Sequence, residues 1–391
     1  TYVPADATYL GMSGVIPGSI GLDDLVWQTN VGRNLGFNFW TFKNRLKLDV
    51  EVYNNRIKDL FFDNVAIPSY TGYNRISANV GVMVNKGFEV GLNTIPYRSK
   101  NWLVGFDFNI AQNLNVIESV SEYYPRTDGK LIDNGVYRSY LQEGNPFGSF
   151  YGFRYKGVYT DAAATRARDA EGNVIEGPNG QEIYMRYNYP NVDYVFQPGD
   201  AMYEDINKDG NINEDDLVYL GNGNPKITGG FGPSVTFKGN VKLQACFSFK
   251  SGFELINKTL ITTTNMHSYE NQSTRVLSRW RNPGDVTDVP RALYRSGYNW
   301  LGSDRYVSDG SFVRLKSVTA RYDFNKAFLT KVKVSRASIY VTAENLATWT
   351  KYKGVDPDVS TRRLNTPFSF LMDESLTPPS KNFVIGLNVG F

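Results

Sequence analysis

The stretch LKLDVEVY, residues Leu46–Tyr53, alternates apolar and polar side chains without a break. One set is apolar and the other is mostly charged; they are Leu46, Leu48, Val50 and Val52 against Lys47, Asp49, Glu51 and Tyr53. Successive side chains of a β-strand point to opposite faces of the sheet, so the stretch predicts a strand with one apolar and one wet face.

The same period of two recurs along the chain, for example in 102–111, 241–250 and 383–391. Many of these segments are longer than the five or six residues usual for strands of globular proteins. We predict nine strands, at about 25–42, 46–62, 81–98, 102–116, 227–238, 241–257, 312–325, 335–349 and 381–391. The expected fold class is therefore all-β.

The connections between these strands are short and long in strict alternation. The short ones are 43–45, 99–101, 238–240 and 326–334, and the long ones are roughly 63–80, 117–226, 258–311 and 350–380. Outer-membrane β-barrels sort their loops in this way, with short periplasmic turns and longer extracellular loops. Bacterial single-chain barrels have an even number of strands, so nine predicts a portion of a larger barrel.

Composition removes several other classes. The 391 residues carry a formal charge of only +3 and no basic run, which argues against nucleic acid. The single cysteine, Cys246, excludes an intramolecular disulfide, and the single histidine, His267, leaves no basis for a histidine-rich zinc site. No segment approaches 18 consecutive apolar residues, and the opening residues do not read as a signal peptide, so we expect a missing N-terminal part.

Several motifs, in this order and spacing, resemble the SusC/RagA-type TonB-dependent transporters of the Bacteroidota outer membrane. They are NKGFEVGLN (85–93), EGNPFGSFYGFRYKGVYTD (143–161), PGDAMYEDINKDGNINEDDLVYLGNGNPKITGGFG (198–232), NPGDVTDVPR (282–291), SDGSFVRLKSVTARYDF (308–324), YVTAENLATWTKYKGVDPD (340–358) and the final FVIGLNVGF. The similarity extends over nearly the whole chain, 1–391.

This resemblance implies the C-terminal nine strands of a 22-stranded antiparallel transmembrane barrel, with a large extracellular excursion at 117–226. The plug, the TonB box and the first strands would lie outside this chain. The implied function is TonB-dependent import of oligosaccharides or oligopeptides across the bacterial outer membrane. The implied partners are TonB, acting through the missing part, and a SusD-like surface lipoprotein that closes over the substrate. The resemblance implies no catalysis.

The run DINKDGNINEDD, residues 205–216, matches the twelve-residue calcium loop of the EF-hand. The expected ligands are oxygens of Asp205, Asn207, Asp209, Asn211 and Asp216, with Gly210 at the turn and Asn213 acting through water. Amphipathic flanking helices are lacking, so we expect a weak structural Ca²⁺ that stiffens the excursion. The alternative is an Asx-rich turn that needs no metal.

Other candidates have structural interpretations. FGSFYGFRYKGVY (147–159) predicts a packed extracellular β-hairpin rather than a sugar-stacking surface, and Trp102, Trp349 and Tyr352 predict an interfacial girdle. The carboxylate pairs Asp215/Asp216 and Asp356/Asp358 do not by themselves indicate a glycosidase, and we expect His267 to be solvated or at an interface. SRWRNPGDVTDVPR, with Arg279, Trp280, Arg281 and Arg291, is either a partner-docking loop or a solvated one.

Two rival functions stay open at this point. One is a secreted, calcium-stabilised glycan-binding β-protein, which would need no detergent. The other is an extracellular β-rich glycoside hydrolase, which would turn over glycans.

Overall fold

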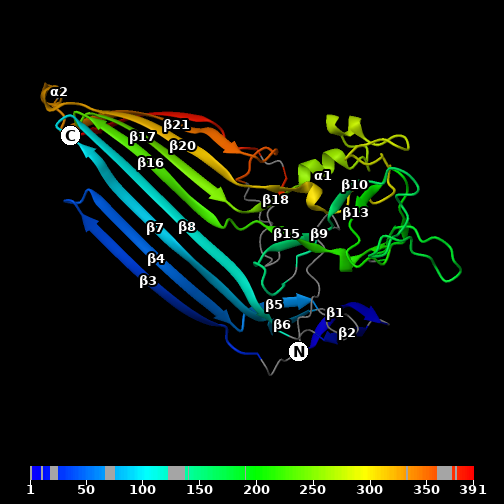
Figure 1. Ribbon diagram of the computed structural model, residues 1–391. Coiled ribbons are helices and arrows are strands. Elements are labelled where there is room, and N and C mark those ends of the chain that lie inside the picture. The colour runs from blue at the N-terminus through cyan, green and yellow to red at the C-terminus, as the bar shows by residue number, and fades with distance from the viewer. Residues whose placement is uncertain are drawn as a thin grey trace.

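The computed structural model describes residues 2–9, 12–17, 25–66, 75–121, 137–139, 141–189, 191–331, 333–358, 372–374 and 377–391. Its main element is one nine-stranded sheet, which we call the wall (Figure 1). Its strands are β3 (Thr29–Thr41), β4 (Leu46–Lys58), β7 (Gly81–Arg98), β8 (Trp102–Val120), β16 (Ile227–Phe237), β17 (Val241–Ser251), β20 (Phe312–Asp323), β21 (Arg336–Thr350) and β23 (Asn382–Gly390). Each strand pairs antiparallel with its neighbours, in sequence order from β3 to β23.

The register places all apolar alternating positions on one face of the wall. Val50 of β4 lies opposite Phe37 of β3 and Val90 of β7, and Val90 lies opposite Ile110 of β8. Farther along, Phe231 of β16 stacks on Phe247 of β17 with ring centroids 4.4 Å apart. This outer face remains open, because Leu35 is 77% exposed and Ile385 is 74% exposed.

The short connections lie together at one end of the wall, which we call the turn end (Figure 1). In the connection 238–240, Lys238 and Gly239 both have positive φ, and Asn240 N donates to the Phe237 carbonyl, which closes a β-turn. Such turns match the right-handed twist of the strands they join. The fourth short connection contains α2 (Lys326–Lys331).

The long connections gather at the opposite end, which we call the loop end (Figure 1). Their elements are β5 (Phe61–Ala66), β6 (Arg75–Asn79), β9 (Ser149–Gly152), β10 (Tyr155–Val158), β11 (Arg186–Tyr187), β12 (Tyr194–Val195), β13 (Ala201–Tyr203), β14 (Asn211–Ile212), β15 (Val218–Asn222), β18 (Glu254–Asn257), α1 (Lys258–Thr264), β19 (Val307–Asp309) and β22 (Met372–Asp373). In the described residues, 3₁₀ turns cover Glu214–Asp216, Thr274–Ser278 and Asp304–Tyr306. β1 (Tyr2–Tyr9) and β2 (Met12–Pro17) form a separate hairpin.

These loops have their own apolar core, unlike the wall. Its largest buried side chains include Phe153, Tyr159, Phe196, Ile212 and Leu301, which come from segments far apart in the sequence. We call the described residues of 137–222 and 252–310 the loop region. Because it buries its aromatic side chains, the loop region packs as a globular unit at the end of the wall.

The all-β prediction is confirmed, and every one of the nine predicted strands is present in one antiparallel sheet. Four boundaries differ by four residues or more. β3 begins at Thr29 rather than at 25. β4 ends at Lys58, and the residues predicted to continue it begin β5 in another sheet. β17 ends at Ser251 and is followed by the separate β18, while β8 continues to Val120. In the described residues no helix has the length and apolar character needed to cross a membrane.

Candidate functional site

The inner face of the wall is a continuous polar surface. Asn34 Nδ2 donates to Glu51 Oε1 at 3.1 Å, and Asn93 Nδ2 donates to Asp107 Oδ1 at 2.7 Å. Farther round the sheet, the hydroxyls of Thr319 and Thr342 lie 2.9 Å apart. These cross-strand pairs give the inner face a polar lining that suits a water-filled interior.

One tyrosine on this face depends on a neighbouring glycine. Tyr53 of β4 lies opposite Gly87 of β7, and its hydroxyl donates to the Gln112 carbonyl, 3.4 Å away, on β8. A Cβ on Gly87 would lie 1.8 Å from that carbonyl oxygen and 2.8 Å from the Tyr53 hydroxyl. Gly87 therefore lets Tyr53 cross β7 and join three strands on the inner face.

The Asx-rich loop forms a compact turn beside the core of the loop region. Asp205 is buried, and its carboxylate accepts hydrogen bonds from the backbone N–H groups of Lys208 and Gly210 at 2.7 and 2.8 Å. Asp209 Oδ1 accepts from Asn211 N at 2.7 Å. Gly210 has φ +83°, and a Cβ there would meet Ala167, so the turn needs glycine.

Asp216 closes this loop from its far end. Its two oxygens accept from Ile206 N at 2.7 Å and Asn213 N at 2.9 Å, so both ends of the turn are tied to one buried carboxylate. Burial raises the pKa of Asp216 to about 6; the two N–H donors oppose this shift, and the carboxylates of Asp205 and Asp209 add to it.

The predicted calcium ligands are thus brought into one loop, with oxygen donors only. Asn207 Nδ2 donates to Asp209 Oδ2 at 3.2 Å, and Asn211 is half-buried. Each carboxylate oxygen that accepts one N–H keeps a second lone pair, so the donor set suits a hard cation. Within the described residues, however, no three His, Cys, Asp or Glu side chains converge as a ready-made metal cluster.

The predicted docking loop is mostly committed to internal contacts. Arg291 Nε donates to Asp200 Oδ1 at 2.7 Å, and Asp200 is fully buried. Trp280 is buried, and its ring lies against Gly199. Arg291 and Trp280 therefore fasten this loop to the excursion, which corrects the docking interpretation for these two residues; Arg279 and Arg281 lie nearer solvent.

Asp200 is the centre of that fastening, and the sequence analysis did not single it out. Its other oxygen accepts from Tyr194 Oη and Gln197 N, both at 2.8 Å. Burial lowers the pKa of Arg291, but the hydrogen bond and charge of the Asp200 carboxylate outweigh it, so this pKa is raised. Burial together with Asp200 raises the pKa of Tyr194 to about 12. The partners lie 91 residues apart, so only the fold brings them together.

Asp356 and Asp358 form ion pairs with the wall strands β20 and β17. Asp356 pairs with the buried Arg314 of β20, and Asp358 lies 2.7 Å from Lys250 Nζ of β17. Asp215 is exposed, while its neighbour Asp216 closes the Asx-rich loop. Asp216, Asp356 and Asp358 therefore have structural partners.

Three aromatic predictions have different outcomes. FGSFYGFRYKGVY is packed, but it is not a hairpin: β9 pairs with β15 and β10 pairs with β13. Trp102 and Trp349 lie exposed at opposite ends of the wall, whereas Tyr352 is buried with Phe253 and is wrong as a girdle residue.

His267 is half-buried, with its ring 5.7 Å from that of Trp300, rather than solvated.

An extended antiparallel sheet with an apolar outer face and a polar inner face is the wall of a transmembrane β-barrel. No family model matches the chain. Among curated proteins it is 29% identical to TonB-dependent receptor P3 and 30% identical to TonB-dependent receptor P39, both of Formosa agariphila, over 97% and 98% of this chain. It is 24% identical to TonB-dependent receptor SusC of Bacteroides thetaiotaomicron over 94% of the chain.

The chain spans only about a third of the length of these relatives, namely 36% of the P3 receptor, 37% of P39 and 32% of SusC. Among solved structures, the RagAB peptide transporter matches the chain with a TM-score of 0.71 and 23% sequence identity. The match covers 100% of this chain and 38% of the transporter chain, and it shows the fold. The resemblance drawn from the motifs is confirmed: the chain is similar along almost its whole length to TonB-dependent receptors, SusC among them, and it shares the fold of the RagAB transporter. The relatives are named as receptors and transporters, not as enzymes.

Proposed function

We propose that this chain supplies the wall and extracellular loops of a TonB-dependent importer in the bacterial outer membrane. Its cargo would be oligosaccharides or oligopeptides, its energy would come through TonB, and a SusD-like lipoprotein would close over the loop end. The observation that carries the proposal is the two-faced wall, combined with relationship to TonB-dependent receptors along the whole chain.

The apolar outer face of the wall argues against the alternative function, a secreted glycan-binding protein. Leu35, Phe37 and Phe383 are more than half exposed, and they are part of an apolar face that extends across the strands. A soluble protein would present this face to water, where contiguous apolar surface of such extent promotes association. Lipid solvates the face without that cost. The hydrolase rival is opposed by the carboxylates of Asp216, Asp356 and Asp358, which hold other parts of the structure.

Uptake by cells tests the importer directly. Cells that produce the whole receptor should accumulate a labelled oligosaccharide or a labelled oligopeptide, and should lose this uptake when TonB is removed. The cargo class is assigned by which label enters. Uptake that persists without TonB, or a receptor that stays soluble without detergent, would contradict the proposal.

We further propose that the Asx-rich loop, residues 205–216, holds a structural calcium ion. Support comes from its oxygen-only donors, from the buried carboxylates of Asp205 and Asp216, and from the left-handed turn at Gly210. Because only three of the expected ligands, Asp205, Asp209 and Asp216, are carboxylates, the amide and backbone oxygens of Asn207 and Asn211 would have to contribute. The ion would stiffen the loop region and leave the wall unchanged.

A further inference from the structure

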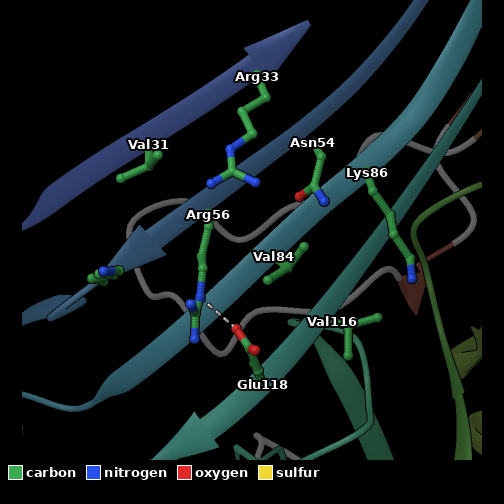
Figure 2. Close-up of a pocket in the computed structure, with 9 residues that line it drawn as sticks. Val31, Arg33, Asn54, Arg56, Val84, Lys86, Val116 and Glu118 are labelled. Carbon is green, nitrogen blue, oxygen red and sulfur yellow. Dashed lines mark ion pairs between the residues drawn. The ribbon is translucent and has the colours of Figure 1, made fainter.

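A basic patch lies near the loop end of β3, β4 and β7, where β4 ends at Lys58. Figure 2 shows its side chains together with Val116 and Glu118. We define the patch as Arg33, Arg56, Lys58 and Lys86, all of which are exposed. They line a shallow cavity of about 470 Å³ whose floor includes Val84 and Val116. The patch lies outside the inner surface and the loops described above.

The strand register fixes which face the patch occupies. Asn54 lies opposite Arg33 on one side and Lys86 on the other, and Arg56 lies opposite Val84. Asn54, Arg56 and Lys58 continue the even-numbered face that carries Leu48, Val50 and Val52 farther down the same strand, with no irregularity between them. The patch is therefore on the apolar, outer face, at the margin nearest the loop end.

The step from cationic to apolar surface is short. Leu35 follows Arg33 by two residues, and Phe88 follows Lys86 by two residues, which places each pair about 7 Å apart along its strand. Leu35, Val52 and Phe88 share one level of the sheet. A bound molecule that reaches from the patch onto this band must therefore be charged at one end and apolar at the other.

The charge of the patch is not balanced within the described part of the chain. Four cationic side chains line the cavity with one anionic side chain, Glu118, which leaves a formal excess of three positive charges. Arg56 Nε pairs with Glu118 at 2.7 Å. Arg33, Lys58 and Lys86 form no ion pair with any described residue, so three cations remain available for an external anion.

We propose that the patch binds the phosphorylated headgroup of an acylated lipid in the outer leaflet. The guanidinium fork of Arg33 and the ammonium of Lys86 would hold a phosphate across Asn54, since both groups recognise phosphate oxygens. The acyl chains would lie on the band that begins at Leu35 and Val52. This inference rests on the proposed function, because it needs the loop end to face outward from the membrane.

Lipid binding to the purified whole receptor tests this site. Native mass spectrometry would compare a diphosphorylated glycolipid, lipid A, with the same lipid after removal of its phosphates. Wild type should retain the phosphorylated form preferentially. Arg33→Gln combined with Lys86→Gln should weaken its binding about 30-fold, because each basic side chain near an anionic surface contributes about 1 kcal/mol.

The matched control removes the same charge at the turn end, through Lys43→Gln with Lys238→Gln, and should bind the lipid as wild type does. Lys58→Gln, at the end of β4, provides a milder variant if the double variant fails to assemble. Equal binding of both lipid forms, or displacement of the lipid by an equal concentration of inorganic phosphate, would overturn the site.

TonB-dependent uptake is measured in parallel to separate the two proposals. Normal uptake with equal lipid binding by wild type and the double variant would contradict the lipid site alone. Absence of TonB-dependent uptake in wild type would contradict the proposed function instead.

Discussion

The wall and the loop region use aromatic and aliphatic side chains in opposite ways. In the wall, Phe37 is 58% exposed and points away from the polar inner face. In the loop region, Phe153 and Phe196 are buried among other aromatic rings. The wall therefore depends on lipid for its apolar burial, whereas the loop region builds a core of its own, as a water-soluble protein does.

This difference determines what holds each part together. Strand pairing in the wall follows the order of its strands along the chain, and this holds even for β8 and β16, which flank the excursion. The loop region is joined by a few specific links between distant segments, such as Asp200 with Arg291. A single substitution at such a link should consequently destabilise the loop region and leave the wall folded. A charge placed on the outer face should destabilise the wall and leave the loop region folded.

Asp200→Ala is expected to give the largest effect and to confine it to the loop region. Removing a buried carboxylate leaves the guanidinium of Arg291 without its partner, and breaking such pairs costs about 3–5 kcal/mol. Hydrogen exchange of the whole receptor should show faster exchange in the loop region and unchanged exchange in the wall. Equally faster exchange in the loop region and in the wall would contradict the view that the two parts are stabilised independently.

Asp193→Ala is the matched control for that substitution. Asp193 pairs with Arg186 at 3.4 Å, but the side chains are 61% and 38% exposed, and exposed pairs contribute only about 0–1 kcal/mol. Its exchange pattern should stay close to that of wild type. A loss as large as that of Asp200→Ala would mean that burial is not what gives the Asp200 pair its importance.

The wall could be predicted from the sequence because its information is local. Period-two alternation fixes both the strands and their faces, and each strand pairs with the next. The same logic could have found the basic patch, since Arg56 and Lys58 occupy the positions of that face after Val52.

The loop region could not be predicted, because its strands are only two to five residues long and several of them pair out of sequence order. β9 pairs with β15 and β10 with β13, so the FGSFYGFRYKGVY segment reads locally as a hairpin although its two strands have other partners. The Asx-rich loop is the exception, since its contacts lie within twelve residues. Its backbone turn follows from the motif, but the same hydrogen bonds serve a metal-free turn, so the motif alone does not assign the ion.

Val50→Arg tests the wall side of the comparison. Val50 is on the outer face between Phe37 and Val90, and an arginine facing lipid near the bilayer midplane costs about 2–4 kcal/mol. We expect lower yield of folded receptor in the outer membrane, measured by heat-dependent mobility in electrophoresis, with loop-region exchange unchanged in the fraction that assembles.

Asp49→Arg, one residue away on the polar inner face, should assemble normally, because it loses only the exposed ion pair with Lys47. Equal damage from Val50→Arg and Asp49→Arg would indicate a sheet buried on both faces and would remove the distinction between wall and loop region.

Asp209→Asn sharpens the comparison within the loop region and has the smallest expected effect. The Asn side-chain carbonyl can replace Asp209 Oδ1 as acceptor for Asn211 N, so the turn is kept while one carboxylate charge is lost. Calcium that binds only the folded loop stabilises it by about 1–3 kcal/mol at 10–100 times its dissociation constant. Wild type should therefore show slower hydrogen exchange around residues 205–216 when calcium is added and faster exchange after chelation, whereas Asp209→Asn should respond to neither. The wall should exchange equally in all four samples, because the ion contacts only the loop. If wild type is as indifferent to calcium as the variant, the Asx turn is self-sufficient and the metal proposal fails.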